Sequence, residues 1–298
     1  MAESLYDAAA ARLRAGDPGA ARDLFRRAAE AGDAKAASAA EAGDAKAASI
    51  YVNLLAAGLG GSRDWPRALR LLAGLGQGSA RAAAALRLIE TMRIDAEGDP
   101  LRAPRGEALS RSPSISRFER LFTQEECAWL VASARPMLAP SVVVDPETGA
   151  QRPDPLRSAD AVGFTAPLEN PAVHALNRRI AAASGTAAAQ GEPLQVLRYA
   201  PGGEYREHLD AIPGFANQRV LTMLVWLNDG FEGGDTCFPA ADMTLRGAPG
   251  DAILFANVRG DGRPDPAARH AGLPVLAGEK WLASRWIRAR PFDYANPR

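Results

Sequence analysis

The chain has 298 residues, enough for two average domains, and its 35 Lys and Arg balance its 35 Asp and Glu. This balance argues against a surface built for polyanions, so nucleic acid is not an expected partner. Two cysteines, Cys127 and Cys237, cannot form a disulfide framework or a four-thiolate zinc site, which favours a cytoplasmic location. We expect no membrane partner, because the N-terminus lacks a secretory signal and no apolar run reaches the roughly 20 residues that span a bilayer.

Residues 1–98 are predicted to be helical, because they are rich in Ala, carry Leu and Arg at helical spacing and contain few β-branched residues. The stretch AEAGDAKAAS occurs twice, at 29–38 and 40–49, and a weaker repeat relates Gly43 to Gly78, 35 positions further on. A period of this length is typical of helical-repeat arrays. The segment resembles the SEL-like repeats, relatives of the tetratricopeptide repeat, which implies a module that binds a protein or peptide. A helical appendage that only stabilises or dimerises the protein is an open alternative.

The predicted linker is residues 99–113, a segment rich in Pro, Gly and charge, and the second domain spans 114–298. A helix is predicted directly after the linker region, in the stretch TQEECAWLVASARPML. Thr123 and Glu126, three positions apart, are expected to form a capping box at its start.

Residues 143–162 form a long segment rich in Asp, Pro and Gly. Loops of this length in a compact domain are usually lids or disordered, and we expect a lid over the substrate. A second helix is predicted over 171–183.

From Pro193 onward, short β-rich segments alternate with turn sequences such as PGGE, NDGFEGGD and GDGRPDP. The predicted strands lie in PLQVLRYA, RVLTMLVWLN, DTCFP, MTLRG, DAILFAN and KWLASRWIRARPF. Many short strands without intervening helices predict an antiparallel barrel or jelly roll. The expected fold class is α+β multidomain, an N-terminal α-helical repeat array followed by a jelly-roll domain with flanking helices.

The chain has three histidines, and His208 stands two positions before Asp210. On a strand, these two side chains would project from the same face and could chelate one metal ion. His270 is the only histidine further downstream and is the candidate third ligand. Two His and one carboxylate, with coordination positions left open, are the ligand set of non-haem Fe(II) oxygenases. Zinc hydrolases prefer three His or two His with Glu, which fits less well. Alone, the His-Leu-Asp stretch is more often a polar surface pair.

Lys280 lies ten positions after His270. A strand leaving the His site can return this cation to the far end of the same pocket, where it would pair with a carboxylate of a bound dicarboxylic acid. The alternative is a solvated surface lysine. Arg285 is the competing cation, but its odd spacing from Lys280 places it on the opposite face of a regular strand.

Four stretches occur together in this order: LRYAPGGEYREHLD, QRVLTMLVWLNDGFEGGDTCFP, GAPGDAILFAN and RHAGLPVLAGEKWLASRWIRARPF. With these stretches the chain resembles the prolyl 4-hydroxylase group of Fe(II)/2-oxoglutarate-dependent dioxygenases, over about residues 114–292. The resemblance implies a double-stranded β-helix in which His208, Asp210 and His270 hold Fe(II) and Lys280 binds the distal carboxylate of 2-oxoglutarate.

Further roles come from the same resemblance. Tyr199 and Thr236 would complete the cosubstrate site. Tyr205, Arg219 and Trp286 match positions on the substrate side, although Tyr205 and Trp286 could instead be core aromatics and Arg219 an edge-strand charge. O2 is the second cosubstrate, and ascorbate keeps the iron reduced in this family.

The sequence thus predicts an Fe(II)- and 2-oxoglutarate-dependent hydroxylase that acts on a prolyl residue of a peptide or protein and releases succinate and CO2. The helical array would recruit that partner. Two alternatives stay open, a hydroxylase of a free amino acid or small metabolite, and a non-catalytic scaffold or sensor that binds metal or 2-oxoglutarate.

Overall fold

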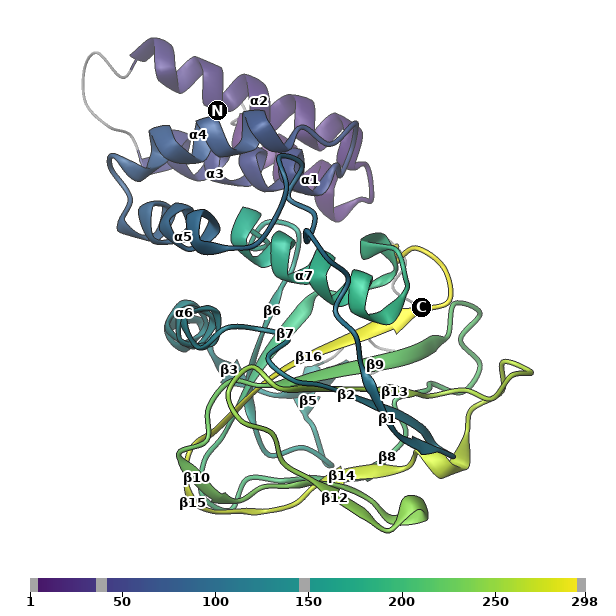
Figure 1. Ribbon diagram of the computed structural model, residues 1–298. Coiled ribbons are helices and arrows are strands. Elements are labelled where there is room, and N and C mark those ends of the chain that lie inside the picture. The colour runs from purple at the N-terminus through teal and green to yellow at the C-terminus, as the bar shows by residue number, and fades with distance from the viewer. Residues whose placement is uncertain (1–4, 36–41, 145–150, 294–298) are drawn as a thin grey trace. The chain divides into compact units, whose positions relative to one another are not determined.

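The computed structural model describes residues 5–35, 42–144 and 151–293 (Figure 1). These residues form two compact units. One unit takes in the described residues up to Arg102 together with Phe164–Arg179 and residues 292–293. The other takes in Ala103–Gly163 and Ile180–Pro291. The second stretch of the first unit therefore comes from within the sequence expected to be the oxygenase domain.

The first unit is helical. Its helices are α1 (Leu5–Arg14), α2 (Pro18–Lys35), α3 (Ala42–Ala57), α4 (Trp65–Gly76), α5 (Ala80–Thr91) and the greater part of α7 (Pro171–Ser184). From α1 to α5, each helix contacts the next along the chain. The N-cap side chains of Asp64 and Ser79 accept hydrogen bonds from the first turns of α4 and α5, which fixes where these two helices begin. The helical prediction is confirmed, whereas the repeat character of these helices stays a prediction.

Buried polar contacts join the segment 164–179 to the rest of the helical unit. The side-chain amide of Asn53 donates to the carbonyl of Pro167 at 2.9 Å, and Arg178 donates to the carbonyl of Glu97 at 2.6 Å. His174 lies near the buried indole of Trp65, with ring centroids 6.4 Å apart. The residues in each contact are far apart in sequence, so no local sequence pattern predicts these contacts.

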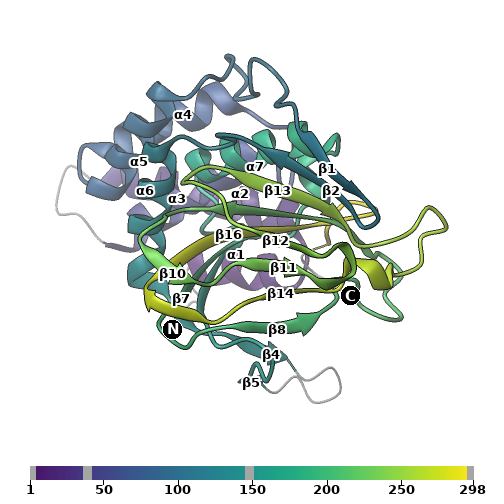
Figure 2. The same ribbon diagram turned by 60° about the horizontal axis from the view of Figure 1, so that its bottom comes forward.

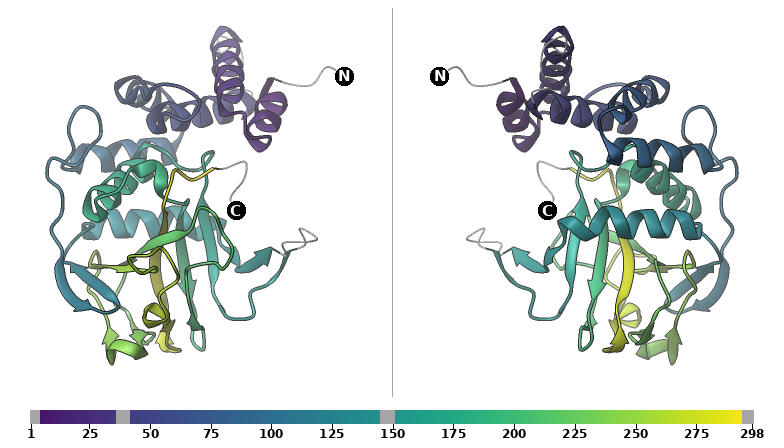
Figure 3. Two further views of the ribbon diagram at one scale, coloured as in Figure 1. Left: turned by 90° about the vertical axis from the view of Figure 1, so that its right-hand side faces the viewer. Right: turned by 90° about the vertical axis from the view of Figure 1, so that its left-hand side faces the viewer.

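The second unit contains a large sheet with the strand order β1-β2-β13-β9-β16-β7-β6-β3. These strands are β1 (Glu107–Arg111), β2 (Ser114–Phe118), β3 (Ala139–Pro140), β6 (Asp160–Phe164), β7 (Leu194–Tyr199), β9 (Arg219–Trp226), β13 (Ala252–Ala256) and β16 (Lys280–Arg288). From β1 to β7 in this order, neighbouring strands pair antiparallel. The helix α6 (Gln124–Ala134) packs beside this sheet and contacts β7 (Figure 3).

A smaller antiparallel sheet has the order β12-β11-β14-β8 (Figure 2). Its strands are β8 (Tyr205–His208), β11 (Thr236–Phe238), β12 (Met243–Leu245) and β14 (His270–Gly272). Two further pairs are β4 (Val142–Val144) with β5 (Gln151–Pro153), and β10 (Phe231–Gly233) with β15 (Val275–Gly278). Short 3-10 helices lie at Arg135–Met137, Ala188–Gln190, Pro239–Ala241 and Pro266–Ala268.

The core of the second unit lies between the two sheets. Phe238 of the small sheet meets Phe255 of the large sheet edge to face, with ring centroids 5.1 Å apart. Leu197, Trp226 and Leu282 of the large sheet are buried in the same cluster. Two antiparallel sheets with one shared apolar core are the expected jelly-roll architecture.

Most of the predicted elements are confirmed. All six strands predicted after Pro193 are present, the helix after Thr123 begins with the predicted capping box, and α7 covers the predicted second helix. The segment 99–113 differs from the expected linker, because β1 forms within it by pairing with β2. No helix in the described ranges is both long and apolar enough to cross a membrane.

Candidate metal and cosubstrate site

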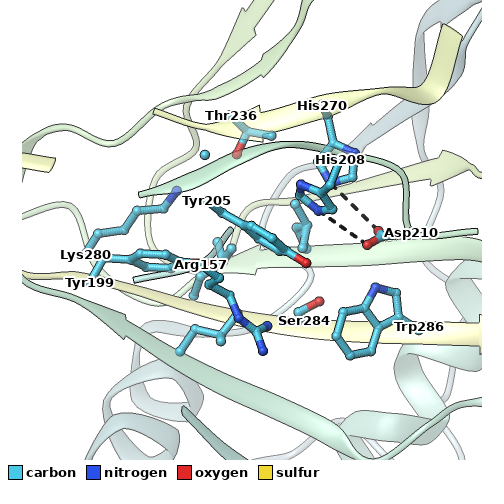
Figure 4. Close-up of a pocket in the computed structure, with 14 residues that line it drawn as sticks. Arg157, Tyr199, Tyr205, His208, Asp210, Thr236, His270, Lys280, Ser284 and Trp286 are labelled. Carbon is cyan, nitrogen blue, oxygen red and sulfur yellow. Dashed lines mark ion pairs between the residues drawn. The ribbon is translucent and has the colours of Figure 1, made fainter. Parts of the chain in front are cut away.

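One pocket of the second unit brings together most of the residues singled out from the sequence (Figure 4). It is lined by residues of both sheets together with Arg157 and Asp210, which lie outside them. The sheet residues are Leu197, Tyr199, Tyr205, His208, Leu224, Thr236, His270, Gly272, Lys280, Leu282, Ser284 and Trp286. Of the nine candidate site residues, only Arg219 is absent from this lining.

Two strands and one turn supply the three candidate metal ligands. His208 ends β8 and lies directly opposite His270 of β14 in the antiparallel register. The expectation that Asp210 also lies on a strand is wrong, because β8 ends at His208 and Asp210 lies in the turn that follows. A hydrogen bond from the backbone N–H of Ile212 to the side chain of Gln218 helps to close this turn.

The three ligand groups converge on one point. One donor atom of each residue lies within 4.8 Å of the other two, and this trio is the one such group of three His, Cys, Asp or Glu among the residues that the structure describes. His208 Nε2 lies 3.5 Å from Asp210 Oδ1, and His270 Nε2 lies 3.8 Å from Asp210 Oδ2. All three side chains are buried.

Backbone carbonyls fix the orientation of both imidazoles. Nδ1 of His208 lies 2.8 Å from the carbonyl of Arg206, and Nδ1 of His270 lies 3.1 Å from the carbonyl of Ala268. A carbonyl only accepts, so Nδ1 carries the proton and the lone pair of Nε2 faces Asp210. Ring contacts add to this: Tyr205 stacks on His208 at 3.5 Å, and Phe238 stacks on His270 at 5.4 Å between centroids.

The protonation states suit a cation. Burial lowers the pKa of His270 to about 4, so its imidazole is neutral near pH 7. Burial alone would raise the pKa of Asp210, but His270, His208 and the hydroxyl of Thr222 outweigh it and hold the pKa of this carboxyl below its ordinary value. Nε2 of His208 is buried without a hydrogen-bond partner in the described part of the chain. An unpartnered buried nitrogen beside a carboxylate and a second imidazole fits a divalent metal ion.

The far end of the pocket holds Lys280, whose side chain is 2% exposed. Its ammonium donates to the carbonyl of Gly234 at 2.5 Å and lies 5.5 Å from the ring centroid of Tyr199, its antiparallel partner across β7 and β16. Burial lowers the pKa of Lys280 to about 8. Thr236 lines the same region. The surface-lysine alternative is therefore excluded.

The turn that carries Gly234 is held from outside by Arg246. The guanidinium contacts the Asp235 carboxylate at 2.5 Å, donates to the carbonyls of Phe231 and Gly233, and lies over the Phe231 ring. Gly233 and Gly234 both have positive φ, and a Cβ on Gly234 would lie 3.2 Å from Cδ of Lys280. The double glycine thus lets the turn approach the lysine closely.

Tyr205 and Trp286 both line the pocket. Arg219 lies behind Trp286 instead, with its guanidinium carbon 3.7 Å from the indole centroid and an ion pair to Glu192 at 2.6 Å. Arg285 points to the other face of β16, as its spacing predicted, and donates to the carbonyl of Glu192.

Arg157 and Ser284 line the pocket but were not predicted. Ser284 shares the strand face of Lys280 and Trp286, so the two-residue periodicity of β16 could have identified it. Arg157 lies over the ring of Tyr205 at 5.2 Å because its segment forms a β-bridge with β8. That pairing is non-local, and no local signal announces it. Arg157 belongs to the segment 143–162 predicted as a lid, of which residues 145–150 lie outside the described residues.

Comparison with known proteins identifies the domain. Residues 194–288 match the 2OG-Fe(II) oxygenase superfamily. The chain is 39% identical over 203 residues to prolyl 4-hydroxylase 1 of Arabidopsis thaliana, a match covering 62% of this chain and 72% of that protein. It is 31% identical over 231 residues to prolyl 4-hydroxylase 5 of the same plant, covering 70% and 78%.

Among solved structures, the chain is similar to a viral collagen prolyl hydroxylase from Paramecium Bursaria Chlorella virus-1 in complex with 2OG, at 25% identity. That match has a TM-score of 0.48 and covers 59% of this chain and 96% of the viral one. The superfamily match, residues 194–288, includes all the strands that line the pocket. This chain belongs to the prolyl 4-hydroxylase family of 2OG-Fe(II) oxygenases, whose cofactor is Fe(II) and whose cosubstrates are 2-oxoglutarate and O2.

Proposed function

We propose that this protein is an Fe(II)- and 2-oxoglutarate-dependent hydroxylase of prolyl residues in a peptide or protein. The overall reaction converts 2-oxoglutarate, O2 and a C–H bond into succinate, CO2 and a C–OH bond. The observation that carries the proposal is a single pocket with a two-His, one-carboxylate trio at one end and a buried lysine at the other. Family membership supports the same reading.

In this proposal, His208, Asp210 and His270 would hold Fe(II). When bound, Fe(II) supplies the redox chemistry that couples decarboxylation of 2-oxoglutarate to hydroxylation of the substrate. Lys280 would bind the distal carboxylate of 2-oxoglutarate, with Tyr199 and Thr236 beside it. The buried ammonium donates one hydrogen bond to Gly234 and has capacity for two more, which suits a carboxylate.

The remaining lining residues would position the substrate and exclude water. Tyr205 and Trp286 offer aromatic surface in the pocket lining, where a proline ring could lie between them. Arg219, which is not in the lining, would act by holding the Trp286 indole in place through its cation–π contact. Ascorbate would serve as the reductant that restores Fe(II) after uncoupled turnover.

The helical unit would recruit or orient the protein that carries the target proline. This assignment is supported by the succession of packed helices in residues 5–91, outside the part of the chain that matches the oxygenase superfamily. It is testable separately on the full chain: kcat/KM for the intact protein substrate should exceed that for a short peptide carrying the same proline, and equal values would refute recruitment by the helical unit.

The test supplies purified protein with Fe(II), 2-oxoglutarate and ascorbate, and compares proline-containing peptides with free proline. We expect a +16 mass increment on the peptides that requires 2-oxoglutarate and matches the succinate formed. Oxygen incorporation into free proline but not peptides would support a metabolite hydroxylase. If none of these substrates gives more succinate with the wild-type protein than with His208→Ala, an enzymatic function is refuted.

A further inference from the structure

A buried chain of two hydrogen bonds leads from Asp210 to two residues outside the pocket lining. The hydroxyl of Thr222 lies 2.6 Å from Oδ2 of Asp210, and Nδ2 of Asn257 lies 2.8 Å from the same hydroxyl. Thr222 and Asn257 are no more than 1% exposed. Neither residue was identified from the sequence, and neither lines the pocket.

The direction of both hydrogen bonds follows from which of the three side chains carries a proton to donate. An ionised carboxylate only accepts, so the single hydroxyl proton of Thr222 is donated to Asp210. The hydroxyl oxygen is then left as an acceptor, and Asn257 must present its NH2 group to it. The chain therefore runs from Asn257 to Thr222 to Asp210, with each donor assigned.

The two residues are anchored more firmly than the carboxylate that they contact. Thr222 lies in the middle of β9 and pairs with Phe255 of β13 on one side and Trp286 of β16 on the other. Asn257 follows β13, and its backbone N–H donates to the carbonyl of Val220 at 2.9 Å. Asp210, in contrast, lies in a turn beyond the end of β8. Through these two residues, the large sheet can fix the position of a carboxylate that its own turn holds less firmly.

We propose that Thr222 and Asn257 are positioning residues for Asp210, which hold Oδ2 and leave Oδ1, the oxygen nearer His208, for the metal ion. This inference rests on the proposed metal site. Hydrogen-bonded partners of ligating residues usually change metal affinity by about 10- to 100-fold when removed, because they fix the orientation of the ligand. The Thr222 hydroxyl fits this description at the one ligand that no strand holds.

Thr222→Val removes the hydroxyl and keeps the side-chain shape, whereas Thr222→Ser keeps the hydroxyl and removes only the methyl group. Anaerobic calorimetric titration with Fe(II), repeated with Mn(II), measures the metal dissociation constant directly. We expect Thr222→Val to weaken binding by about 10- to 100-fold, Thr222→Ser to remain close to wild type, and the KM for 2-oxoglutarate to change much less. Thr244→Val, at an exposed position of β12, is the matched control and should leave metal binding unchanged.

The outcomes separate this inference from the proposed function. A wild-type protein that binds neither ion would refute the metal site itself. A wild type that binds metal, with Thr222→Val equal to it, would refute only the positioning role. Should Thr222→Val fail to fold, Asn257→Ala decides the question, since it keeps Thr222 but removes the donor that orients its hydroxyl: wild-type affinity would overturn the proposal, and weakened affinity would support it.

Discussion

Each unit of the molecule contains a buried His–carboxylate pair, and the two pairs differ in one respect. In the helical unit, Nδ1 of His174 lies 2.7 Å from Glu169, and Asn177 donates to the same carboxylate oxygen at 2.9 Å. In the oxygenase unit, His208 lies 3.5 Å from Asp210, and its Nε2 has no hydrogen-bond partner among the described residues. The first pair is closed by a direct hydrogen bond, whereas the ligand atoms of His208, Asp210 and His270 converge within 4.8 Å of one another without such a bond to His208 Nε2 among the described residues.

A structural His–carboxylate pair and a metal-ligand pair can both be buried, as His174–Glu169 and His208–Asp210 are. Residue type does not separate them, since both contain an imidazole and a carboxylate. Spacing and hydrogen-bond partners do, because a buried polar group without a partner is costly unless it serves a ligand. Mutations of the two histidines should therefore give opposite phenotypes.

The largest expected effect is on turnover. His208→Ala should reduce 2-oxoglutarate-dependent succinate formation by at least roughly a thousandfold, because it removes a metal ligand on which several kcal/mol of the rate acceleration depend. Circular dichroism should show a native fold. Succinate formation by this variant within tenfold of wild type would contradict the assignment.

Lys280→Ala should raise the KM for 2-oxoglutarate by about 10- to 100-fold, the range expected when a charge-assisted hydrogen bond of about 1.5–3 kcal/mol is lost. Steady-state kinetics with 2-oxoglutarate as the varied substrate measures this effect. Arg263→Ala, at an exposed ion pair with Asp261, is a matched loss of positive charge and should leave this KM unchanged. Equal behaviour of the two variants would remove Lys280 from the cosubstrate site.

The same lysine predicts a pH dependence. Burial lowers the pKa of Lys280 to about 8, with Asp235 raising it and Arg246 lowering it; the pKa of the nearby Tyr199 is raised to about 12 by burial, so that phenol stays neutral in this range. A bound carboxylate favours the ammonium, so the dissociation constant for 2-oxoglutarate should rise with pH above about 8, approaching tenfold per unit. A flat profile between pH 7 and 9.5, measured by calorimetry with metal present, would contradict this.

Lys280 should also affect stability, with a definite sign. Because its folded-state pKa lies below the ordinary value of 10.5, the charged form disfavours folding at pH below about 8, and this penalty is relieved as the pH rises from about 8 toward 10.5. Lys280→Met should therefore gain stability relative to wild type at pH 7 more than at pH 10, as measured by urea unfolding.

His174→Ala should lower the free energy of unfolding by about 1–3 kcal/mol, because the buried Glu169 loses a hydrogen-bond partner. Its metal affinity should equal that of wild type. Urea unfolding followed by helical circular dichroism, with a metal titration in parallel, checks both parts. If His174→Ala loses metal binding but not stability, the assignment of the His174–Glu169 pair as structural is wrong.

The smallest expected effect is at Arg246. This guanidinium is partly exposed, and such ion pairs contribute about 1 kcal/mol or less, so Arg246→Ala should raise the KM for 2-oxoglutarate no more than about fivefold. The cause would be a looser turn around Gly234. Arg246→Lys, which keeps the charge but cannot make the forked contacts, should behave like Arg246→Ala if the turn matters and like wild type if only the charge does.

The strands that carry Tyr199, Lys280 and Trp286 were predictable because their patterns are local, whereas β8 and β14, which carry the two histidines, were not among the predicted strands. Short β-rich segments and flanking turn sequences marked β7, β9, β13 and β16, and the two-residue periodicity of β16 separated Lys280 from Arg285. The contribution of β2 was not predictable, since it is held by β13, more than a hundred positions away in sequence. The role of Thr222 was not predictable for a similar reason, because it depends on the position that Asp210 takes after β8 ends.

Two residues show the limit of transferring roles by position. Arg219 matched a substrate-side position in the sequence, yet its side chain lies behind Trp286 and pairs with Glu192. Arg157 lay in a segment read only as a lid, yet it lines the pocket through a bridge to Tyr205. In both cases a non-local contact decides where the side chain points, and a single sequence does not encode that contact locally.

The most direct test of the central claim is an anaerobic Fe(II) titration of wild type, His174→Ala and His208→Ala by calorimetry. We predict one equivalent of bound metal for wild type and for His174→Ala, and no saturable binding for His208→Ala. Equal binding by all three proteins would contradict the assignment of the His208, Asp210 and His270 trio as the metal site.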